Sequence, residues 1–402
     1  MKEPDSSSQK AFQRRIRRHV LGPDHRFAVI TPPELSALCR DELRGLGITE
    51  TVVTQAGIEY SGDLVSCYLS NLHLRTASRV LCRFSTFRAG VVGELLHKVL
   101  NLKWELWLNP RILLQVEAHV EHSRIGHEGL VADTVFSGIR KRFGMLGLPL
   151  PELRGSAAAA EPGDRQRIIV HLTHNHCELS LDTTGAHLHQ RGYRTTHAVA
   201  PMRETLAAAL LLKSGWNGST PLVDGMCGSG TFPVEAVWMA RRLPPGLRRR
   251  FLFQEWPSFR QKTWEYLCRR AVEASTDSCP MPVIAMDIDA EALSTAMKNA
   301  ERAGIQKDIT WMETDFLEFI PHRHGLSPGL LVLNPPYGKR MAEGDDLLYR
   351  RLGDHLRTYF AGWRVAVLVP SRSHASQLNM PSIRLWRIVH GGLPVFAAMG
   401  RL

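Results

Sequence analysis

The chain has 402 residues, which is beyond the size at which one hydrophobic core keeps growing, so two or three domains are expected. Its 44% hydrophobic and 22% charged residues are typical of a folded globular protein and exclude the disordered and membrane-embedded classes. An excess of 50 Lys and Arg over 39 Asp and Glu gives a net charge of +11, which favours a polyanionic partner such as nucleic acid.

Targeting and redox signals point to the cytoplasm. Residues 1–20 carry four arginines but no apolar run of signal-peptide length, and no stretch of about 18 apolar residues occurs in the chain. The seven cysteines are odd in number and include no Cys-x-x-Cys pair, which favours reduced thiols and no structural zinc. We therefore expect a cytoplasmic protein without a membrane span or a metal.

The first half of the chain shows mixed helix and strand patterns, preceded by residues 1–24, which are polar and basic and predict a flexible tail. Residues 25–95 predict one small α+β domain, and residues 96–182 predict a second. The strands expected in these domains are 27–30, 58–63, 79–84, 112–118, 168–174 and 177–181, and the helices are 33–46, 64–72, 94–100 and 129–143. Residues 183–199, rich in Gly, Thr, His and Arg, predict an interdomain linker.

From residue 200 to 402, short apolar runs alternate with helical stretches, which is typical of a parallel sheet with crossover helices. The expected parallel strands are 222–225, 283–287, 309–313, 330–333 and 365–369. The runs 383–389 and 394–399 are too close together for a parallel crossover, so the sheet should end in an antiparallel hairpin. The fold class is α/β with a Rossmann-like sheet, after an α+β front half.

A glycine-rich turn, Asp224-Gly-Met-Cys-Gly-Ser-Gly-Thr, follows the first of these strands. Its glycines allow the backbone to approach a ligand, and the amides at the start of the next helix would face that ligand. No Lys follows Gly230, which disfavours a phosphate-binding P-loop. The turn alone fits a nucleoside, a dinucleotide or a plain tight turn.

Acidic residues end the next two strands. Asp287 lies where a ribose diol would bind beside the first loop of a doubly wound sheet, and Asp315 is suitably placed to accept a hydrogen bond from an adenine amino group. Asp289 is better explained as a helix cap.

The decisive motif is Asn334-Pro335-Pro336-Tyr337, at the end of the fourth strand. An exocyclic base amine is a poor nucleophile because its lone pair is delocalised into the ring. The Asn334 side-chain oxygen and the Pro335 carbonyl can both accept from the NH2 group and orient it towards a methyl donor. Tyr337 offers a stacking face for a flipped-out base.

Two other groups of residues are weaker candidates for a functional site. His171, His174, His176 and Cys177 fall on a hairpin whose alternate positions face opposite sides, which disfavours a metal site. The segment from Arg241 to Trp256 combines arginines with aromatic residues, and it fits an RNA-binding surface as well as a helix packed by its aromatics.

Several motifs together resemble the class I methyltransferases that carry an N-terminal THUMP RNA-binding domain, and most of all the bacterial 23S rRNA guanine-N2 methyltransferases. The resemblance starts near residue 26 and rests on four segments: Asn71-Leu-His-Leu-Arg-Thr-Ala-Ser-Arg-Val, Leu179-Ser-Leu-Asp-Thr, Leu188-His-Gln-Arg-Gly-Tyr-Arg and Ala200-Pro-Met-Arg-Glu-Thr-Leu. It implies a ferredoxin-like domain at 25–95, a THUMP domain at 96–182 and a methyltransferase domain at 200–402.

The resemblance also implies S-adenosyl-L-methionine as the cofactor and assigns residues to it. The implied cofactor contacts are Pro201, Thr205, Asp224, Met226, Cys227, Gly228, Gly230, Asp287, Ile288, Asp315, Phe316 and Asn334. The implied catalytic residues are Asn334, Pro335, Pro336 and Tyr337, and the implied RNA contacts are Arg191, Arg194, Lys339 and Arg340. The chain departs from the family at Gly225, where a proline is usual and a looser loop is expected, and at Ala132, where Lys is usual.

The sequence thus predicts an RNA methyltransferase that modifies the exocyclic N2 of a guanine, with 23S rRNA or a ribosomal precursor as the partner. A tRNA guanine is the nearest alternative. Adenine-N6 or protein glutamine methylation would use the same Asn-Pro-Pro-Tyr chemistry. A non-catalytic RNA-binding assembly factor is the alternative from a different class.

Overall fold

The computed structural model describes residues 6–152, 165–194, 202–336, 346–390 and 392–402. Contacts divide the chain into two units, 1–188 with 249–268 and 189–248 with 269–402. Within the described ranges, no helix is long and apolar enough to cross a bilayer.

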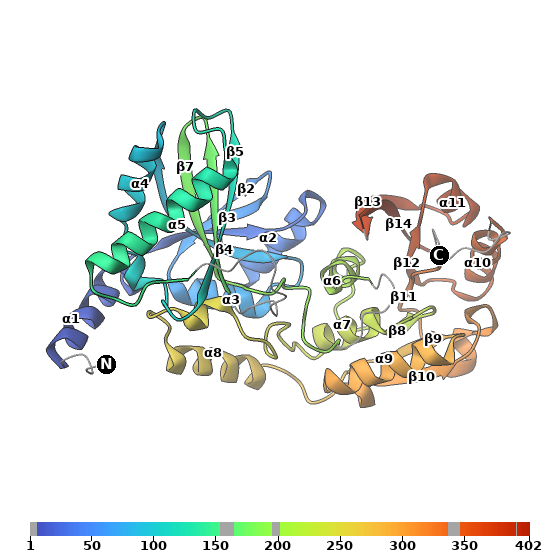
Figure 1. Ribbon diagram of the computed structural model, residues 1–402. Helices are drawn as coiled ribbons and strands as arrows, with labels where there is room; N and C mark the ends of the chain where they lie inside the picture. The colour runs from blue at the N-terminus through green and yellow to red at the C-terminus, as the bar shows by residue number, and fades with distance from the viewer. Residues whose placement is uncertain (1–5, 153–164, 195–201, 337–345, 391) are drawn as a thin grey trace. The chain divides into compact units, whose positions relative to one another are not determined.

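The first unit is built on a seven-stranded sheet in the order β2-β3-β1-β4-β7-β6-β5 (Figure 1). Its strands are β1 (His25–Ile30), β2 (Thr51–Thr54), β3 (Gly57–Gly62), β4 (Arg79–Arg88), β5 (Leu113–Glu121), β6 (Arg165–Thr173) and β7 (His176–Asp182). Neighbours are antiparallel except for β5 and β6, which run parallel. Strand β4 pairs with β1 on one side and β7 on the other, so the two front domains expected from the sequence share one sheet.

The helices of this unit follow the apolar patterns of the sequence. They are α2 (Ser36–Gly45), α3 (Leu64–His73), α4 (Val92–Leu100) and α5 (Glu128–Met145). The Asp63 side chain caps α3 by accepting from the Ser66 amide at 2.9 Å, which satisfies an amide that the helix leaves free. In Figure 1, α4 and α5 lie together beside the β5 end of the sheet.

The expected flexible tail is wrong for residues 6–21. Ser6–Ile16 form α1, and Arg17–Leu21 continue it as a turn of π-helix. The side chains of Ile16 and Val20 are buried, and Arg15 pairs with the buried Glu105. Two apolar anchors and one ion pair therefore hold a segment whose composition is typical of a free tail.

Residues 249–268 belong to the first unit, although they lie within the second half of the chain. Phe251, Phe253 and Trp256 are buried there. Phe253 stacks on Tyr68 with 4.5 Å between the ring centroids, and the Trp256 indole donates to Gln166 at 2.8 Å. These contacts support the packing interpretation of the aromatics in this segment over the RNA-binding one.

The second unit contains the predicted parallel sheet, in the order β10-β9-β8-β11-β12-β14-β13. Its strands are β8 (Leu222–Asp224), β9 (Val283–Asp287), β10 (Ile309–Glu313), β11 (Leu330–Leu333), β12 (Arg364–Val369), β13 (Arg384–His390) and β14 (Leu393–Arg401). The first five are parallel, and β14 pairs antiparallel with both β12 and β13. The predicted closing hairpin is confirmed.

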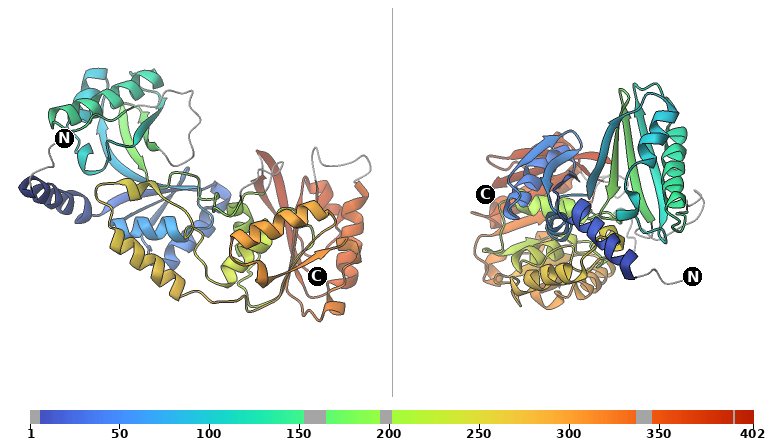
Figure 2. Two further views of the ribbon diagram at one scale, coloured as in Figure 1. Left: turned by 60° about the horizontal axis from the view of Figure 1, so that its bottom comes forward. Right: turned by 90° about the vertical axis from the view of Figure 1, so that its left-hand side faces the viewer.

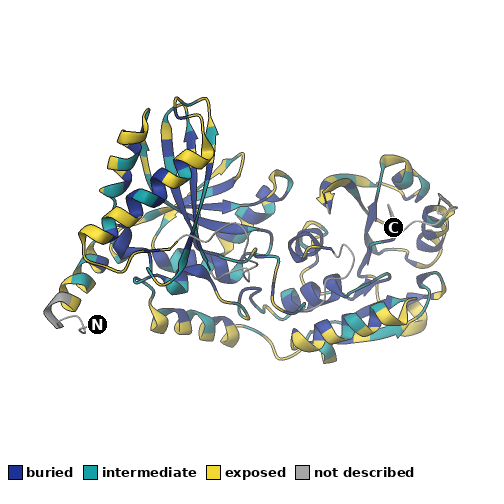
Figure 3. Ribbon diagram, viewed as in Figure 1, coloured by how far each residue is buried: buried dark blue, intermediate teal, exposed yellow. Residues whose placement is uncertain are grey.

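Helices cover both faces of this sheet. They are α6 (Glu204–Lys213), α7 (Thr231–Ala240), α9 (Ala290–Arg302), α10 (Asp346–Tyr359) and α11 (Arg372–Gln377). Helix α8 (Gln261–Glu273) begins in the first unit, where Trp264 packs edge-on against Tyr68 and Phe253. Alternate residues of β8, such as Leu222 and Val223, belong to separate buried clusters, one packed with α6, α7 and α9 and the other with α10 and α11. Exposed residues lie along the outer sides of α5 and α9 (Figure 3).

Candidate active site

The sheet of the second unit reverses its strand order at β8, which has β9 on one side and β11 on the other. In open α/β sheets, ligands bind outside the carboxyl ends of the strands at such a switch point. The glycine turn leaves β8 here, and Asn334 follows β11. In the β8–β11 ladder Val332 is opposite Asp224, so Asn334 lies just beyond the end of the pairing.

The glycine turn is held by backbone bonds to both neighbouring strands. The Gly225 amide donates to Val332 at 3.3 Å, and the Cys227 amide donates to Met286 at 2.9 Å. Gly228 and Gly230 have φ values of +51° and +80°, which favour glycine. A Cβ on Gly228 would meet no atom within 4 Å, so this part of the turn faces open space where a ligand could lie.

The loosening expected at Gly225 is not what the structure shows. A Cβ added there would lie 2.3 Å from Cδ2 of Phe316 and 2.6 Å from Cδ2 of Leu333. Phe316 is buried and packs on Phe360, with 5.6 Å between the ring centroids. The absence of a side chain at residue 225 therefore lets the Phe316 ring pack against the turn.

Asp224 ends β8 and is completely buried. Its Oδ1 accepts from the Met226 amide at 3.3 Å, whereas its Oδ2 has no hydrogen-bond partner among the described residues. Burial raises the pKa of Asp224 well above its usual range; the hydrogen bond from Met226 opposes this effect, and the nearby Asp287 carboxylate adds to it. A buried carboxylate with an unsatisfied oxygen is suited to a ligand that brings a positive charge.

Asp287 links the ends of β9 and β8. Its Oδ2 accepts from the Gly228 amide at 2.7 Å, and its Oδ1 accepts from the Asp289 amide at 3.0 Å. The side chain is half-buried, and each carboxylate oxygen keeps a lone pair for a further donor. Asp289 caps α9 by accepting from the amides of Glu291 and Ala292, which confirms its interpretation as a cap.

Three other residues assigned to the cofactor lie at the ends of β9 and β10. Asp315 begins a short 3-10 turn, where its Oδ1 accepts from the Leu317 amide at 2.9 Å. The Ile288 side chain is 72% exposed, which is unusual for a residue directly after a core strand. Phe316 is buried in the core, and its ring packs against Gly225 of the glycine turn.

Asn334 is half-buried, and its Oδ1 is a buried acceptor with no partner within the described part of the chain. Pro335 is buried and Pro336 is exposed. Tyr337, Lys339, Arg340 and Pro201 lie outside the described residues. Thr205 on α6 and Cys227 in the glycine turn are each 8% exposed, and Met226 is half-buried.

Arg191 and Arg194 are not available as the RNA contacts that the resemblance implied. Both are held inside the second unit: the Arg191 side chain is 1% exposed and lies 3.4 Å from a Glu235 oxygen. Arg194 lies 3.3 Å from Glu204 and donates to the Met202 carbonyl at 2.9 Å and to the Thr231 hydroxyl. Because Thr231 is the first residue of α7, Arg194 braces the helix that follows the glycine turn. The sequence alone could not show this, since neither glutamate is adjacent to its arginine in the chain.

Comparison with known proteins identifies the family. Residues 191–394 match the family described as "RMKL-like, methyltransferase domain". The chain belongs to this methyltransferase family. Residues 26–81 match the "RlmL ferredoxin-like domain", which confirms the ferredoxin-like part of the front half.

Two relatives of this methyltransferase differ in length. The chain is 32% identical to the Synechocystis sp. protein named "Putative RNA methyltransferase slr0064", over 90% of this chain and 92% of that one. It is 35% identical to the "Ribosomal RNA large subunit methyltransferase K/L" of Syntrophotalea carbinolica, over 92% of this chain and 52% of that one. The chain thus spans about half the length of the K/L relatives that it matches.

Solved structures confirm the fold. SMU.472, described as "a putative methyltransferase complexed with SAH", is 26% identical, has a TM-score of 0.83 and covers 95% of this chain and 99% of its own. A Listeria monocytogenes protein described as "a predicted N6-adenine-specific DNA methylase" is 28% identical, has a TM-score of 0.80 and covers 93% of this chain and 96% of its own.

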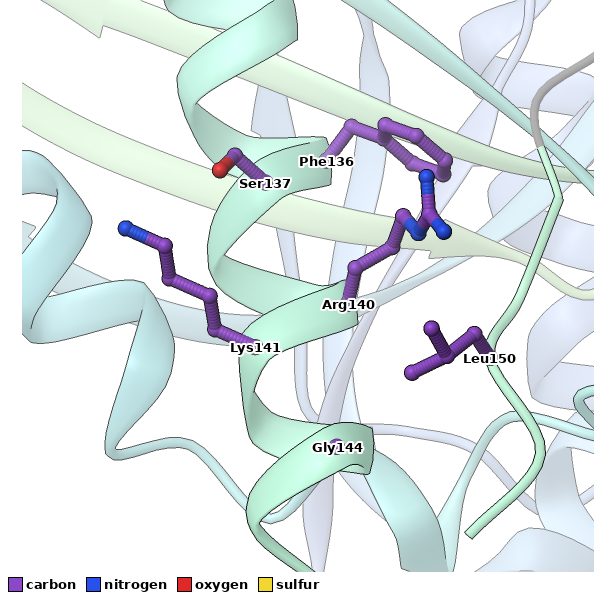
Figure 4. A pocket seen from close by; sticks show the side chains of 6 residues that line it. All are labelled: Phe136, Ser137, Arg140, Lys141, Gly144 and Leu150. Carbon is purple, nitrogen blue, oxygen red and sulfur yellow. The ribbon is translucent and has the colours of Figure 1, made fainter.

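A shallow pocket also lies in the first unit, against α5 (Figure 4). Its lining is Phe136, Ser137, Arg140, Lys141, Gly144 and Leu150. Arg140 lies over the Phe136 ring at 5.8 Å from the centroid. None of these residues belongs to the set assigned to the cofactor or the base.

Proposed function

We propose that this methyltransferase uses S-adenosyl-L-methionine to methylate the exocyclic N2 of a guanine in large-subunit ribosomal RNA. The observation that carries the proposal is Asn334 at the switch point, with an unsatisfied buried oxygen, two residues past the register of the buried Asp224. The K/L relatives are named for ribosomal RNA of the large subunit, which favours that substrate. Residues 96–182 are proposed to form its THUMP domain and 183–199 its linker.

The described residues fit the cofactor. When bound, S-adenosyl-L-methionine supplies an electrophilic methyl group. The unpartnered Oδ2 of Asp224 would accept from the amine of its methionine part, and the open space at Gly228 leaves room for that part of the molecule. Asp287 would accept from ribose hydroxyls, Asp315 would accept from the adenine amino group, and the exposed Ile288 would cover the ring.

Asn334 and Pro335 are proposed to prepare the nucleophile. The Asn334 Oδ1 and the Pro335 carbonyl accept the two hydrogens of the exocyclic amine, which draws the nitrogen lone pair out of conjugation and directs it away from these oxygens. The nitrogen would then form the new N–C bond as the S–CH3 bond of the methyl donor breaks and S-adenosylhomocysteine leaves, and the methylated amine would release one proton to water. A neutral amine needs no ionised base before attack, so we expect no essential titration of a catalytic His near neutral pH.

Mass spectrometry of nucleosides tests the substrate. The purified protein is incubated with S-adenosyl-L-methionine and either large-subunit rRNA or total tRNA, and the RNA is digested to nucleosides. N2-methylguanosine in the rRNA alone is the expected result. N2-methylguanosine found only in the tRNA would mean that tRNA, and not rRNA, is the substrate. N6-methyladenosine would favour the adenine specificity for which the Listeria protein is named, and no product with either RNA would favour a non-catalytic factor.

A further inference from the structure

Helix α1 precedes the segment that matches the ferredoxin-like domain, which starts at residue 26. Two buried side chains and one hydrogen bond fix α1 and the π-helical turn that continues it. Ile16 and Val20 are 1% and 0% exposed, and the His25 ring bonds the Val20 carbonyl at 2.7 Å. The His25 ring also packs edge-on against Trp107, with 4.9 Å between the ring centroids. The helix lies at the margin of the first unit in the left-hand view of Figure 2.

A charged network strengthens this anchor. The carboxylate of Glu105 is 1% exposed and accepts from Arg15 of α1 and from Arg142 of α5. Burial alone would raise the pKa of Glu105, but the hydrogen bonds from Arg142 and Arg15 lower it below its usual value. Arg15 is therefore neutralised as part of the anchor.

The remaining lysine and arginine side chains of α1 and of the π-helical turn Arg17–Leu21 have no such partner. We call them, with a neighbouring lysine, the cationic strip: Lys10, Arg14, Arg17, Arg18 and Lys103. All five are exposed, and no carboxylate in the described part of the chain pairs with them. Residues 6–23 contain no Asp or Glu. Lys10, Arg14 and Arg17 are spaced by four and three residues, which places them near one side of the helix, and Arg18 follows directly. Ile16 and Val20 are buried, whereas these cations are exposed.

The His19 ring lies beside these cations. It lies 3.1 Å from the Lys103 ammonium. Desolvation lowers the pKa of His19, and the charges of Lys103, Arg18 and Arg15 lower it further. One further positive charge is thus disfavoured at this site, whereas an anion would be attracted to it.

We propose that the cationic strip binds the phosphate backbone of the RNA substrate and so adds a sequence-independent contact surface to the first unit. This inference rests on the proposed function, because it takes the polyanion to be RNA. An anionic membrane is the less suitable partner, since a helix that inserts into an interface presents large apolar side chains outward, whereas the apolar anchors of α1 face the protein. Phosphate contacts position an RNA without reading its sequence.

The test compares three variants of the full chain. The strip variant carries Lys10→Gln, Arg14→Gln, Arg17→Gln and Arg18→Gln. The charge-matched control carries Arg269→Gln, Arg270→Gln, Lys298→Gln and Lys307→Gln, all exposed positions outside α1. The rescue variant changes Arg14, Arg17 and Arg18 to Lys. Binding to transcribed large-subunit rRNA is measured over a range of KCl concentrations. Calorimetry with S-adenosylhomocysteine checks that the second unit of each variant still binds its ligand.

The strip variant should bind rRNA at least about tenfold more weakly at moderate salt, with a salt slope reduced by about 3, because each lost phosphate contact removes about 0.7 to 0.9. The control and the rescue variant should stay within about threefold of the wild type. An unchanged strip variant, or an equal loss in the control, overturns the proposal. If the strip variant loses binding to phosphatidylglycerol vesicles but keeps its rRNA binding, the RNA proposal is overturned and the strip binds an anionic membrane instead. Failure of the wild type to bind any RNA would instead overturn the proposed function itself.

Discussion

Asp224 and Asn334 each present a buried side-chain oxygen without a partner among the described residues, at adjacent strand ends. Leaving such an oxygen unsatisfied typically costs about 1–3 kcal/mol, so a folded protein retains it where a ligand completes it. Asp224 is suited to a cationic group and Asn334 to a neutral amine, and this difference separates the cofactor side of the site from the base side.

The raised pKa of Asp224 makes cofactor binding depend on pH. Because burial raises this pKa, the free protein holds a proton on Asp224 at a pH where an exposed aspartate would be ionised. A ligand amine binds the ionised form, so binding must release that proton. The affinity for S-adenosylhomocysteine should therefore fall as pH falls through the raised pKa, by at most about tenfold per pH unit.

Calorimetry in buffers of different ionisation enthalpy measures the released proton. The titrations belong below about pH 7, where the amine of the ligand stays protonated. The variant Asp224→Asn should bind more weakly and lose the pH dependence. An identical pH dependence in Asp224→Asn would assign the proton to another group.

Asp287 accepts a hydrogen bond from the Gly228 amide and is proposed to bind the ribose, and Asp289 provides the matched control. Asp287→Ala should weaken S-adenosylhomocysteine binding by about a hundredfold, since charge-assisted hydrogen bonds contribute about 1.5–3 kcal/mol each and the Gly228 amide also loses its acceptor. Asp289→Ala removes only the cap of α9 and should lower stability by about 1 kcal/mol while leaving binding nearly unchanged. Equal effects of the two substitutions on binding would argue against a cofactor contact at Asp287.

At the level of elements, the glycine turn and the short turn that begins at Asp315 are packed as one piece through Gly225 and Phe316. Gly225→Ala should destabilise the protein by about 1–3 kcal/mol, because the new Cβ would overlap a buried ring. It should also weaken cofactor binding by displacing the turn. Urea unfolding checks the stability.

A double-mutant cycle with Phe316→Leu tests the cause. A smaller side chain at residue 316 should recover part of the loss from Gly225→Ala, giving a coupling energy of at least about 0.5 kcal/mol. Strict additivity of the two substitutions would mean that the contact does not explain the effect.

The sequence was most informative where burial imposes a repeating pattern. Every expected strand is present, with β9, β10 and β11 at the expected bounds. Strands β9 and β11 lie inside the parallel sheet, where burial of both faces requires continuous apolar runs. Strand β2 was missed, since Val52 and Val53 are exposed on an edge strand. Helix α1 and the turn that continues it were missed because Ile16 and Val20 are their two buried apolar anchors, and two residues give no visible period.

The identity of the site residues could be predicted from the sequence, but their burial and their contacts could not. The sequence indicated Asp224, Asp287 and Asn334 through their positions at strand ends. It could not show that Arg191 is buried, because its partner Glu235 comes from a distant part of the chain. The role of Gly225 could not be predicted either, since the Phe316 ring that fills the place of its side chain comes 91 residues later in the chain.

For the whole molecule, the assignment of residues 249–268 to the first unit has a consequence for truncation. A fragment of residues 1–195 lacks Phe251, Phe253 and Trp256, all buried in that unit. Loss of one buried aromatic typically costs about 3–5 kcal/mol, and loss of all three approaches the full stability of a domain, about 5–15 kcal/mol. This fragment should show no cooperative thermal transition by circular dichroism.

A joined fragment provides the control. Residues 1–188 linked by a short Gly-Ser segment to residues 249–268 should fold, because Arg249 donates to the His187 carbonyl at 2.7 Å and the Phe253 amide donates to Thr183 at 3.1 Å. If the 1–195 fragment proved as stable as the joined one, the buried aromatics would not be needed by the first unit.

The central claim is that Asn334 activates an exocyclic guanine amine, and the variant Asn334→Ala tests it most directly. Wild type and variant are compared by mass spectrometry of N2-methylguanosine in rRNA after incubation with S-adenosyl-L-methionine, and by calorimetry with S-adenosylhomocysteine. The variant should form product about a hundred- to a thousandfold more slowly, because one preorganised acceptor at the reacting centre is lost, while its affinity for S-adenosylhomocysteine stays close to that of the wild type. A variant that forms N2-methylguanosine at the wild-type rate would contradict the account.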